Sequence, residues 1–230
     1  MNKLIATLLL FVTFSMDGYS LNPLKTFFTH AESKDIFVDG VIDCAEWGAI
    51  DSVVGLCSPW VPVGKDNTVF KCFCSEAYFN FCFNVDEKTI VNNSYADELS
   101  VTKGDRVELF FTADTVLSQY FCMEISPTGY LLDYSAQYYR KFDNSWKLNG
   151  CDLAAKYTPK GYVVEGRILI SELEKLGIKV KESFYLGIFR ADFTNMNSKD
   201  VIWYSWVDPQ KQVPDFHVPT AFGICKYVGK

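Results

Sequence analysis

Two runs of alternating residues, joined by a short polar turn, constrain the fold of this chain more than any other feature. The runs are Val69 to Cys74 and Tyr78 to Val85, and Ser75-Glu76-Ala77 connects them. Every second residue from Phe79 to Val85 is apolar and falls on one side of an extended strand. The pattern predicts an antiparallel hairpin in which a slip of one residue would exchange core and solvent.

Further β-rich runs recur along the chain, and one segment predicts a helix. In Ser171-Glu172-Leu173-Glu174 a serine at the expected N-cap precedes a glutamate by three residues, and Gly177 follows as a helix stop. No linker, low-complexity run or repeat divides the sequence. We therefore expect one antiparallel all-β domain with one short helix. The other expected strands are Arg106 to Thr112, Tyr120 to Ile125, Tyr130 to Tyr134, Tyr162 to Ile170, Phe184 to Phe193 and Phe222 to Val228.

The first twenty residues have the character of an export signal. Lys3 precedes an apolar run from Leu4 to Phe14 that is too short to cross a bilayer as a helix, and Gly18-Tyr19-Ser20 offers small residues to a signal peptidase. We expect residues 1–20 to be a signal peptide and residues 21–230 to be a periplasmic or extracellular domain. No later segment predicts a membrane span. A net charge of -6 without a basic stripe argues against a nucleic-acid partner.

The eight cysteines do not define a disulfide framework. Four of them fall inside expected strands, where a small apolar thiol packs well, and we expect these four to be buried and unpaired. They are Cys72, Cys74, Cys82 and Cys122. The pairing of the others stays open, with Cys44, Cys57 and Cys151 in expected loops and Cys225 in the last strand.

The sequence carries no recognisable catalytic motif. His30 and His217 are the only histidines, and the motifs of serine hydrolases, zinc peptidases and phosphate-binding loops are missing. Asp105 and Glu108 are an acidic pair of the kind used in glycoside hydrolysis, but three residues apart on a strand they point to opposite faces. We expect no enzymatic activity and nominate no catalytic residue.

Four segments, in order, carry a resemblance to a known family. They are Asp39 to Trp47, Gly104 to Phe110, Gly161 to Ile168, and the aromatic tail from Trp203 to Gly223. Together they resemble the family 9 carbohydrate-binding modules, xylanase-associated β-sandwiches of jelly-roll or DOMON-like type. The resemblance covers Ile36 to Tyr227. It implies that a monomeric module binds a mono- or oligosaccharide, or a polysaccharide chain end, and supports polysaccharide degradation by a separately encoded glycoside hydrolase.

The aromatic tail is the expected sugar-binding surface. Aromatic planes stack on the apolar face of a pyranose, and polar side chains bind its hydroxyls. By resemblance, Phe216 occupies the place of one clamp ring, and Tyr95 is the ring nearest to the place of the second. Trp206 is either a ligand ring or a core ring, and Arg190 either pairs with a carboxylate or lines a cavity. We nominate as ligand-binding residues Trp206, Phe216, His217, Arg190, Arg140, Tyr120, Glu124 and Trp146.

The other nominations rest on side-chain type and strand position. The guanidinium of Arg140 could reach sugar hydroxyls or the carboxylate of an acidic sugar. By resemblance, Tyr120 and Glu124 share one side of a strand that crosses the concave face of the sandwich. Trp60 and Trp146 lie in polar surroundings, and we expect both rings to be exposed.

Two further hypotheses concern cofactors. A structural calcium ion is plausible in a carbohydrate-binding sandwich, and Asp39, Asp43 and Asp105 lie near expected turns, although the sequence fixes no ligand set. The alternative function is that of a haem-binding, DOMON-like electron-transfer domain, in which Met123 and His217 would hold the iron. A partner-binding domain without affinity for glycans is the third reading.

Overall fold

The computed structural model describes residues 24–195 and 200–229. The predicted signal peptide lies outside these residues. Within them, no helix combines the length and the hydropathy that a membrane crossing requires.

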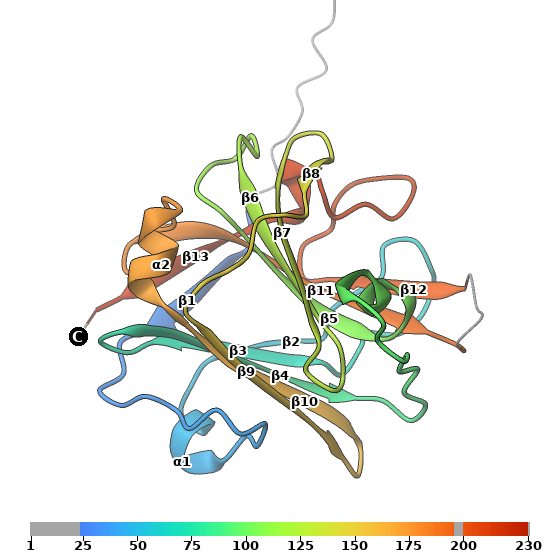
Figure 1. Cartoon of the computed structure of the whole chain (residues 1–230), viewed down its shortest axis with the longest axis horizontal. Helices are drawn as coiled ribbons and strands as arrows, with labels where there is room; N and C mark the ends of the chain where they lie inside the picture. The colour runs from blue at the N-terminus through green and yellow to red at the C-terminus, as the bar shows by residue number, and fades with distance from the viewer. Residues whose placement is uncertain (1–23, 196–199, 230) are drawn as a thin grey trace, which may run out of the picture.

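Two β-sheets pack face to face and form a sandwich (Figure 1). The large sheet contains β1 (Thr26–His30), β5 (Arg106–Thr112), β6 (Tyr120–Ile125), β7 (Leu131–Gln137), β8 (Lys141–Asp143), β11 (Ser183–Phe193), β12 (Val201–Ser205) and β13 (Gly223–Val228). The small sheet contains β2 (Ser52–Val54), β3 (Val69–Cys74), β4 (Tyr78–Asp86), β9 (Cys151–Thr158) and β10 (Gly161–Leu169).

The strand order differs from the sequence order in both sheets. The large sheet has the order β1-β13-β11-β5-β6-β7-β8, with β12 paired to β11, and the small sheet has the order β2-β3-β4-β10-β9. Neighbouring strands are antiparallel except β1 and β13, which are parallel. The predicted fold class, an antiparallel two-sheet sandwich, is confirmed.

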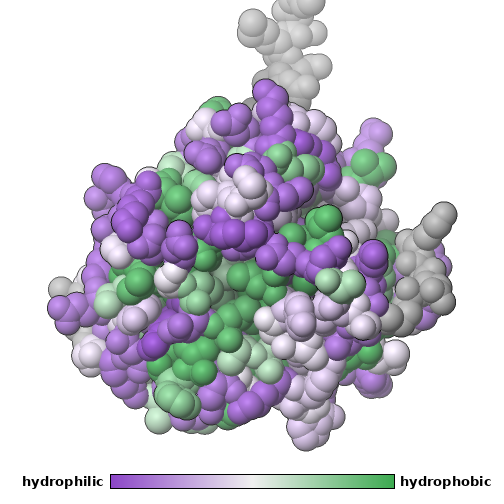
Figure 2. Space-filling model, viewed as in Figure 1, coloured by the Kyte–Doolittle hydropathy of each residue, from purple (hydrophilic) through white to green (hydrophobic). Residues whose placement is uncertain are grey.

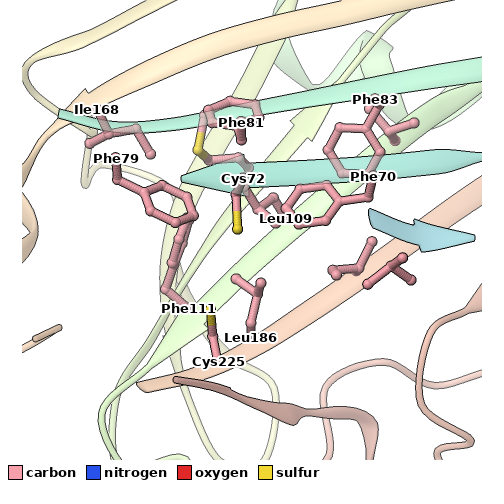
Figure 3. Close-up of a cluster of buried hydrophobic side chains, with 14 of the residues drawn as sticks. Phe70, Cys72, Phe79, Phe81, Phe83, Leu109, Phe111, Ile168, Leu186 and Cys225 are labelled. Carbon is pink, nitrogen blue, oxygen red and sulfur yellow. The ribbon is translucent and has the colours of Figure 1, made fainter. Parts of the chain in front are cut away.

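The predicted hairpin is β3 and β4, and its apolar side forms the centre of the core. Phe79, Phe81, Phe83 and Val85 are fully buried between the sheets. Figure 3 shows these phenylalanines of the small sheet facing Leu109 and Phe111 on the large sheet. The opposite side of β4 is not uniformly solvated, because Cys82 packs against a small second cluster beneath the sheet. The predicted register is therefore correct, although both sides of the strand carry buried residues.

Short helices connect the strands at two places. The helix α1 (Cys44–Trp47) was not predicted, and Asp43 caps it by accepting a hydrogen bond from the Glu46 N–H. The helix α2 (Ile170–Lys175) corresponds to the predicted one and ends before Gly177, whose φ of +80° favours glycine. The predicted cap is wrong, since the N-cap is Leu169 and Ser171 lies within the first turn. Two 3₁₀ turns span Glu98–Lys103 and Pro219–Ala221.

The strands missing from the sequence prediction are β1, β2, β8, β9 and β12. Of these, β2 and β8 contain only three residues each. The edge strand β9 is half-exposed along much of its length, so it lacks a strong apolar alternation. It begins at Cys151, a residue that we expected in a loop.

All eight cysteines lie in the described part of the chain and are unpaired. Cys72, Cys74, Cys82 and Cys122 are buried, as predicted. Burial raises the pKa of the Cys74 thiol to about 12, so this group stays protonated at neutral pH. Cys225 is also buried and lies opposite Cys72 across the sandwich (Figure 3).

Both faces of the large sheet are covered in its middle. The inner face packs on the small sheet, and the outer face is covered by the segment before β13, which buries Phe216, Val218 and Phe222. Every residue of β5 and β6 is consequently buried. Elsewhere the sandwich is less closed. Figure 2 shows hydrophobic residues in a hollow at the middle of the viewed face. The segment between β8 and β9 packs Trp146 and Leu148, both half-buried, against the core.

Trp206 belongs to the core between the sheets. Its indole is only 7% exposed and packs against the backbone of Gly223, where a Cβ would overlap the ring. We predict that Trp206→Ala lowers the free energy of unfolding by about 3–5 kcal/mol, because it removes a large buried ring and leaves a cavity. Chemical denaturation measures this effect. The control is Phe37→Ala, a ring that is 76% exposed, which should change stability by less than about 0.5 kcal/mol. Unchanged stability of Trp206→Ala would contradict the core assignment.

Candidate ligand-binding site

A pocket of about 280 Å³ opens on the outer face of the large sheet. Alternation along β5 creates its floor, since Val107 and Leu109 face the inner core, whereas Arg106 and Glu108 face outward. The neighbouring strand β6 adds Glu124, which lies directly opposite Glu108 in the register. The walls and rim are Arg140, Trp203, Pro214, Asp215, Phe216 and His217.

The floor of the pocket is a buried ion-pair cluster around one guanidinium. The Nε atom of Arg106 lies 2.6 Å from Oε2 of Glu124 and 2.9 Å from Oε1 of Glu108. All three side chains are at most 7% exposed. The hydroxyl of Tyr134 donates a hydrogen bond to Oε1 of Glu124 at 2.8 Å. Trp203 lies over the guanidinium, with 5.2 Å between Cζ and the ring centroid.

The two carboxyl groups of the floor compete for the same cation. Burial, followed by the charge of Glu124, raises the pKa of Glu108 to about 8, although Arg106 opposes the shift. Burial would lower the pKa of Arg106, but the two glutamates raise it above its ordinary value, so the guanidinium stays charged. At neutral pH the floor therefore contains a charged guanidinium and a protonated Glu108 carboxyl group.

Three atoms of this floor lack a hydrogen-bond partner in the described protein. They are Nε of Arg106, Oε1 of Glu108 and Oε2 of Glu124. Their mutual distances are those of ion pairs, but the directions do not satisfy hydrogen-bond geometry. Each of these atoms has almost no solvent-accessible surface, so the floor is stabilised at these atoms by their contacts with one another.

A second charged cluster forms the rim. Asp215 accepts hydrogen bonds from Tyr139 at 2.7 Å, from Nη2 of Arg140 at 2.9 Å and from the backbone N–H of His217 at 3.0 Å. Burial alone would raise the pKa of Asp215, but the hydrogen bond from Tyr139 and the contacts with His217 and Arg140 hold it below its ordinary value. Asp215 thus fixes the β7–β8 turn to the loop before β13.

His217 presents a neutral imidazole to the pocket. Burial, followed by the charge of Arg140, lowers its pKa to about 4. Its Nδ1 lies 3.1 Å from the hydroxyl of Tyr120. At neutral pH the ring therefore offers a hydrogen-bonding group without a charge.

The aromatic rings of the pocket differ in the surface they leave free. Phe216 is 5% exposed, because its ring stacks in parallel on Phe189 at 4.1 Å, makes an edge contact with Trp203 and lies at a tilt to Trp60. Trp203 is half-buried and lines the pocket. Trp203 is therefore better placed than Phe216 to stack on a ligand.

The structure brings five of the eight nominated residues together. Phe216, His217, Arg140 and Glu124 line the pocket, and Tyr120 contacts it through His217. Trp206 lies in the inner core, and Trp146 packs half-buried on Phe121 at 5.0 Å. Neither of these tryptophans lines the pocket.

Arg190 also lies away from the pocket, in a buried ion-pair network. Its guanidinium is 2.6 Å from Asp66, 2.5 Å from Glu87 and 3.6 Å from Asp192. Of the two alternatives for this residue, pairing with carboxylates is the one observed.

The prediction that two other rings are exposed is wrong. Trp60 and Trp146 are half-buried, not exposed. Trp60 donates its indole N–H to the Lys211 carbonyl and packs near Phe216. Tyr95 stacks on Tyr130 at 4.3 Å and does not line the pocket.

Five residues of the pocket were not nominated from the sequence. They are Arg106, Glu108, Trp203, Pro214 and Asp215. The alternation of side chains along β12 could have predicted the position of Trp203. Tyr204 and Trp206 point into the inner core, so Trp203 points to the outer face. Asp105 precedes β5, accepts the backbone N–H groups of Val91 and Phe193, and does not join Glu108 in the lining of the pocket.

The residues named for calcium and for haem do not meet in the described part of the chain. Asp39, Asp43 and Asp105 are each engaged by nearby backbone N–H groups at separate places, and the described residues contain no cluster of three or more metal-ligating side chains. Met123 is buried between the sheets, whereas His217 lies on the outer face of the large sheet. These two residues cannot both ligate one haem iron.

A two-sheet sandwich with a polar, aromatic-walled pocket on one face is the arrangement of a carbohydrate-binding module. The family model described as "Carbohydrate family 9 binding domain-like" matches residues 38–230, so the chain belongs to this family. The predicted resemblance is confirmed. A comparison with curated protein sequences finds no significant match.

Solved structures of low sequence identity share the fold. A candidate carbohydrate-binding protein from Bacteroides uniformis is 13% identical, with a TM-score of 0.70 over 89% of this chain and 100% of that one. A carbohydrate-binding module of family 9 from Caldicellulosiruptor kristjanssonii, in complex with glucose, is 14% identical, with a TM-score of 0.60 over 90% of this chain and 97% of that one. The complex of such a module from the same organism with cellotriose has a TM-score of 0.59 at 14% identity, over 90% and 95% of the two chains.

We predict that Glu108→Gln makes stability less dependent on pH. The carboxyl pKa of Glu108 is raised from 4.5 to about 8, so the folded protein keeps a proton that the unfolded chain releases. Stability from this group is therefore present at low pH and is lost as the pH rises from about 4.5 to 8. Glutamine cannot ionise, so the melting temperature of the variant relative to wild type should rise across this range.

Thermal unfolding of both proteins from pH 4.5 to 9 measures this difference. Asp105 and Asp192 also have raised pKa values, about 7 and about 6, but both are present in each protein and largely cancel. A difference in melting temperature that stays constant with pH would show that Glu108 does not hold a proton in the folded state.

Proposed function

We propose that this chain binds a neutral saccharide in the pocket above Arg106, without chemical turnover. The observation that carries the proposal is a pocket with a polar floor, a neutral imidazole and an aromatic wall, in a domain of this family. A sugar hydroxyl both donates and accepts, so a few adjacent hydroxyls can satisfy a guanidinium N–H and carboxyl oxygens together. Trp203 supplies an aromatic wall for the apolar face of the ring.

The charge balance of the pocket favours a neutral sugar over an acidic one. Arg106 is paired with Glu108 and Glu124, and Arg140 is paired with Asp215. An anionic sugar would have to displace a carboxylate from one of these guanidinium groups or be buried near it without a partner. Both alternatives cost binding energy.

The wider role belongs to the same proposal. The module would act as a monomer outside the cytoplasm, after loss of the signal peptide expected at residues 1–20. There it would support polysaccharide degradation by a separately encoded glycoside hydrolase. Membership of the family and the apolar segment from Leu4 to Phe14 support this role.

We predict that Trp203→Ala weakens binding of neutral saccharides at least tenfold, because it removes the stacking wall, which corresponds to about 1.4 kcal/mol. Titration calorimetry with a panel of neutral mono- and oligosaccharides that includes glucose and cellotriose measures the change. Glucuronic acid should bind more weakly than glucose to the wild type.

Two further variants make the test specific. Glu124→Gln keeps the shape of the floor while removing a carboxylate, and it should weaken binding although the variant still folds. Phe37→Ala lies far from the pocket and should leave binding unchanged. If no neutral saccharide perturbs the indole N–H resonance of Trp203 in the wild type, the proposed function is wrong.

A further inference from the structure

The hairpin that joins β7 to β8 carries three exposed aromatic rings within five residues. Tyr138 is 47% exposed, Tyr139 is 51% exposed and Phe142 is 44% exposed. We call these three rings the hairpin platform. In the rest of the described chain, the exposed aromatic rings are Phe28, Phe37, Tyr130 and Tyr157, and Tyr130 is stacked on the half-buried Tyr95. Clusters of exposed rings mark binding surfaces more often than isolated rings do.

The hairpin platform is continuous with the rim of the pocket. Arg140, between Tyr139 and Phe142, lines the pocket itself. Tyr139 donates its hydroxyl to Asp215, another lining residue, at 2.7 Å. The ring of Phe142 lies 5.0 Å from that of His217 at an angle of 76°. In Figure 1 this hairpin projects beyond the large sheet at β8.

The three rings differ in how much of the fold depends on them. Phe142 also packs at 5.5 Å on Tyr134, and Tyr139 is held by its hydrogen bond, so both contribute to the rim. Tyr138 touches Tyr139 at 5.4 Å, and its hydroxyl makes no hydrogen bond within the described protein. Tyr138 thus has a free ring surface and a free hydroxyl next to the pocket.

The small volume of the pocket limits what it can enclose. About 280 Å³ is just below the usual range for small-ligand pockets, so a saccharide longer than one or two units must leave the pocket across its rim. On the side of Arg140, the surface that such a chain meets is the hairpin platform. Exposed rings next to hydroxyl groups suit a second pyranose, which presents both an apolar face and polar edges.

We propose that the hairpin platform is a second subsite, and that the ligand is a neutral oligosaccharide with one unit in the pocket and the next on Tyr138 and Phe142. This inference rests on the proposed function of the pocket. In this arrangement the hairpin platform determines the preference for saccharide length, and the floor of the pocket recognises the first sugar unit.

The experiment compares mono-, di- and trisaccharides of the gluco-, xylo-, manno- and galacto-series by titration calorimetry. The wild type should bind the trisaccharide of its preferred series at least about tenfold more tightly than the monosaccharide. Tyr138→Ala should remove most of this advantage and leave monosaccharide binding unchanged. Phe142→Leu, which retains an apolar contact with His217, should reduce the advantage in the same direction.

Two control variants separate the possible outcomes. Trp203→Ala should weaken mono- and trisaccharide binding alike, and Phe37→Ala should change neither. Equal affinity of the wild type for mono- and trisaccharides, or an undiminished advantage in Tyr138→Ala, would overturn the second subsite and leave the pocket's function standing. Binding to no saccharide of any series would overturn both.

Discussion

The charge of Arg106 is the feature on which the outer face of the large sheet depends. A buried guanidinium without partners would cost several kcal/mol, on the order of the whole stability of many domains. Glu108 and Glu124, opposite each other on β5 and β6, offset this cost and in turn require the cation. Because three polar side chains occupy the centre of an otherwise aromatic surface, the segment before β13 cannot close over them completely. The pocket is the space that remains.

Parts of the fold were readable from the sequence because one physical pattern dominates them. The β3–β4 hairpin shows a period of two on its apolar side, and β5 and β6 begin and end where predicted. The edge strands were missed because half-exposed residues carry little signal. A central strand covered on both faces loses the contrast between core and solvent, so the sequence of β5 could not say which of its faces carries the pocket.

The sequence predicted several residues of the candidate site but not their arrangement in space. The aromatic tail led to Phe216 and His217, yet the same reasoning also selected Trp206, which enters the inner core. The sequence alone does not distinguish Phe216 from Trp206, since each is an aromatic residue near a turn. Arg106, Glu108 and Trp203 escaped prediction for another reason: they come from β5 and β12, and only the strand order of the folded sheet brings them close to Glu124 on β6.

The position of β5 and β6 in the middle of the large sheet has a consequence for recognition. Side chains anchored on central strands are held by ladders on both sides, so the floor exists in its final shape before any ligand arrives. Ligand binding then costs little side-chain conformational entropy at the floor of the pocket. The Arg140 turn and the segment around Asp215, by contrast, are surface connections, which tolerate sequence change far better. Related chains could therefore acquire new ligand preferences through changes in these two connections while keeping the same pocket floor.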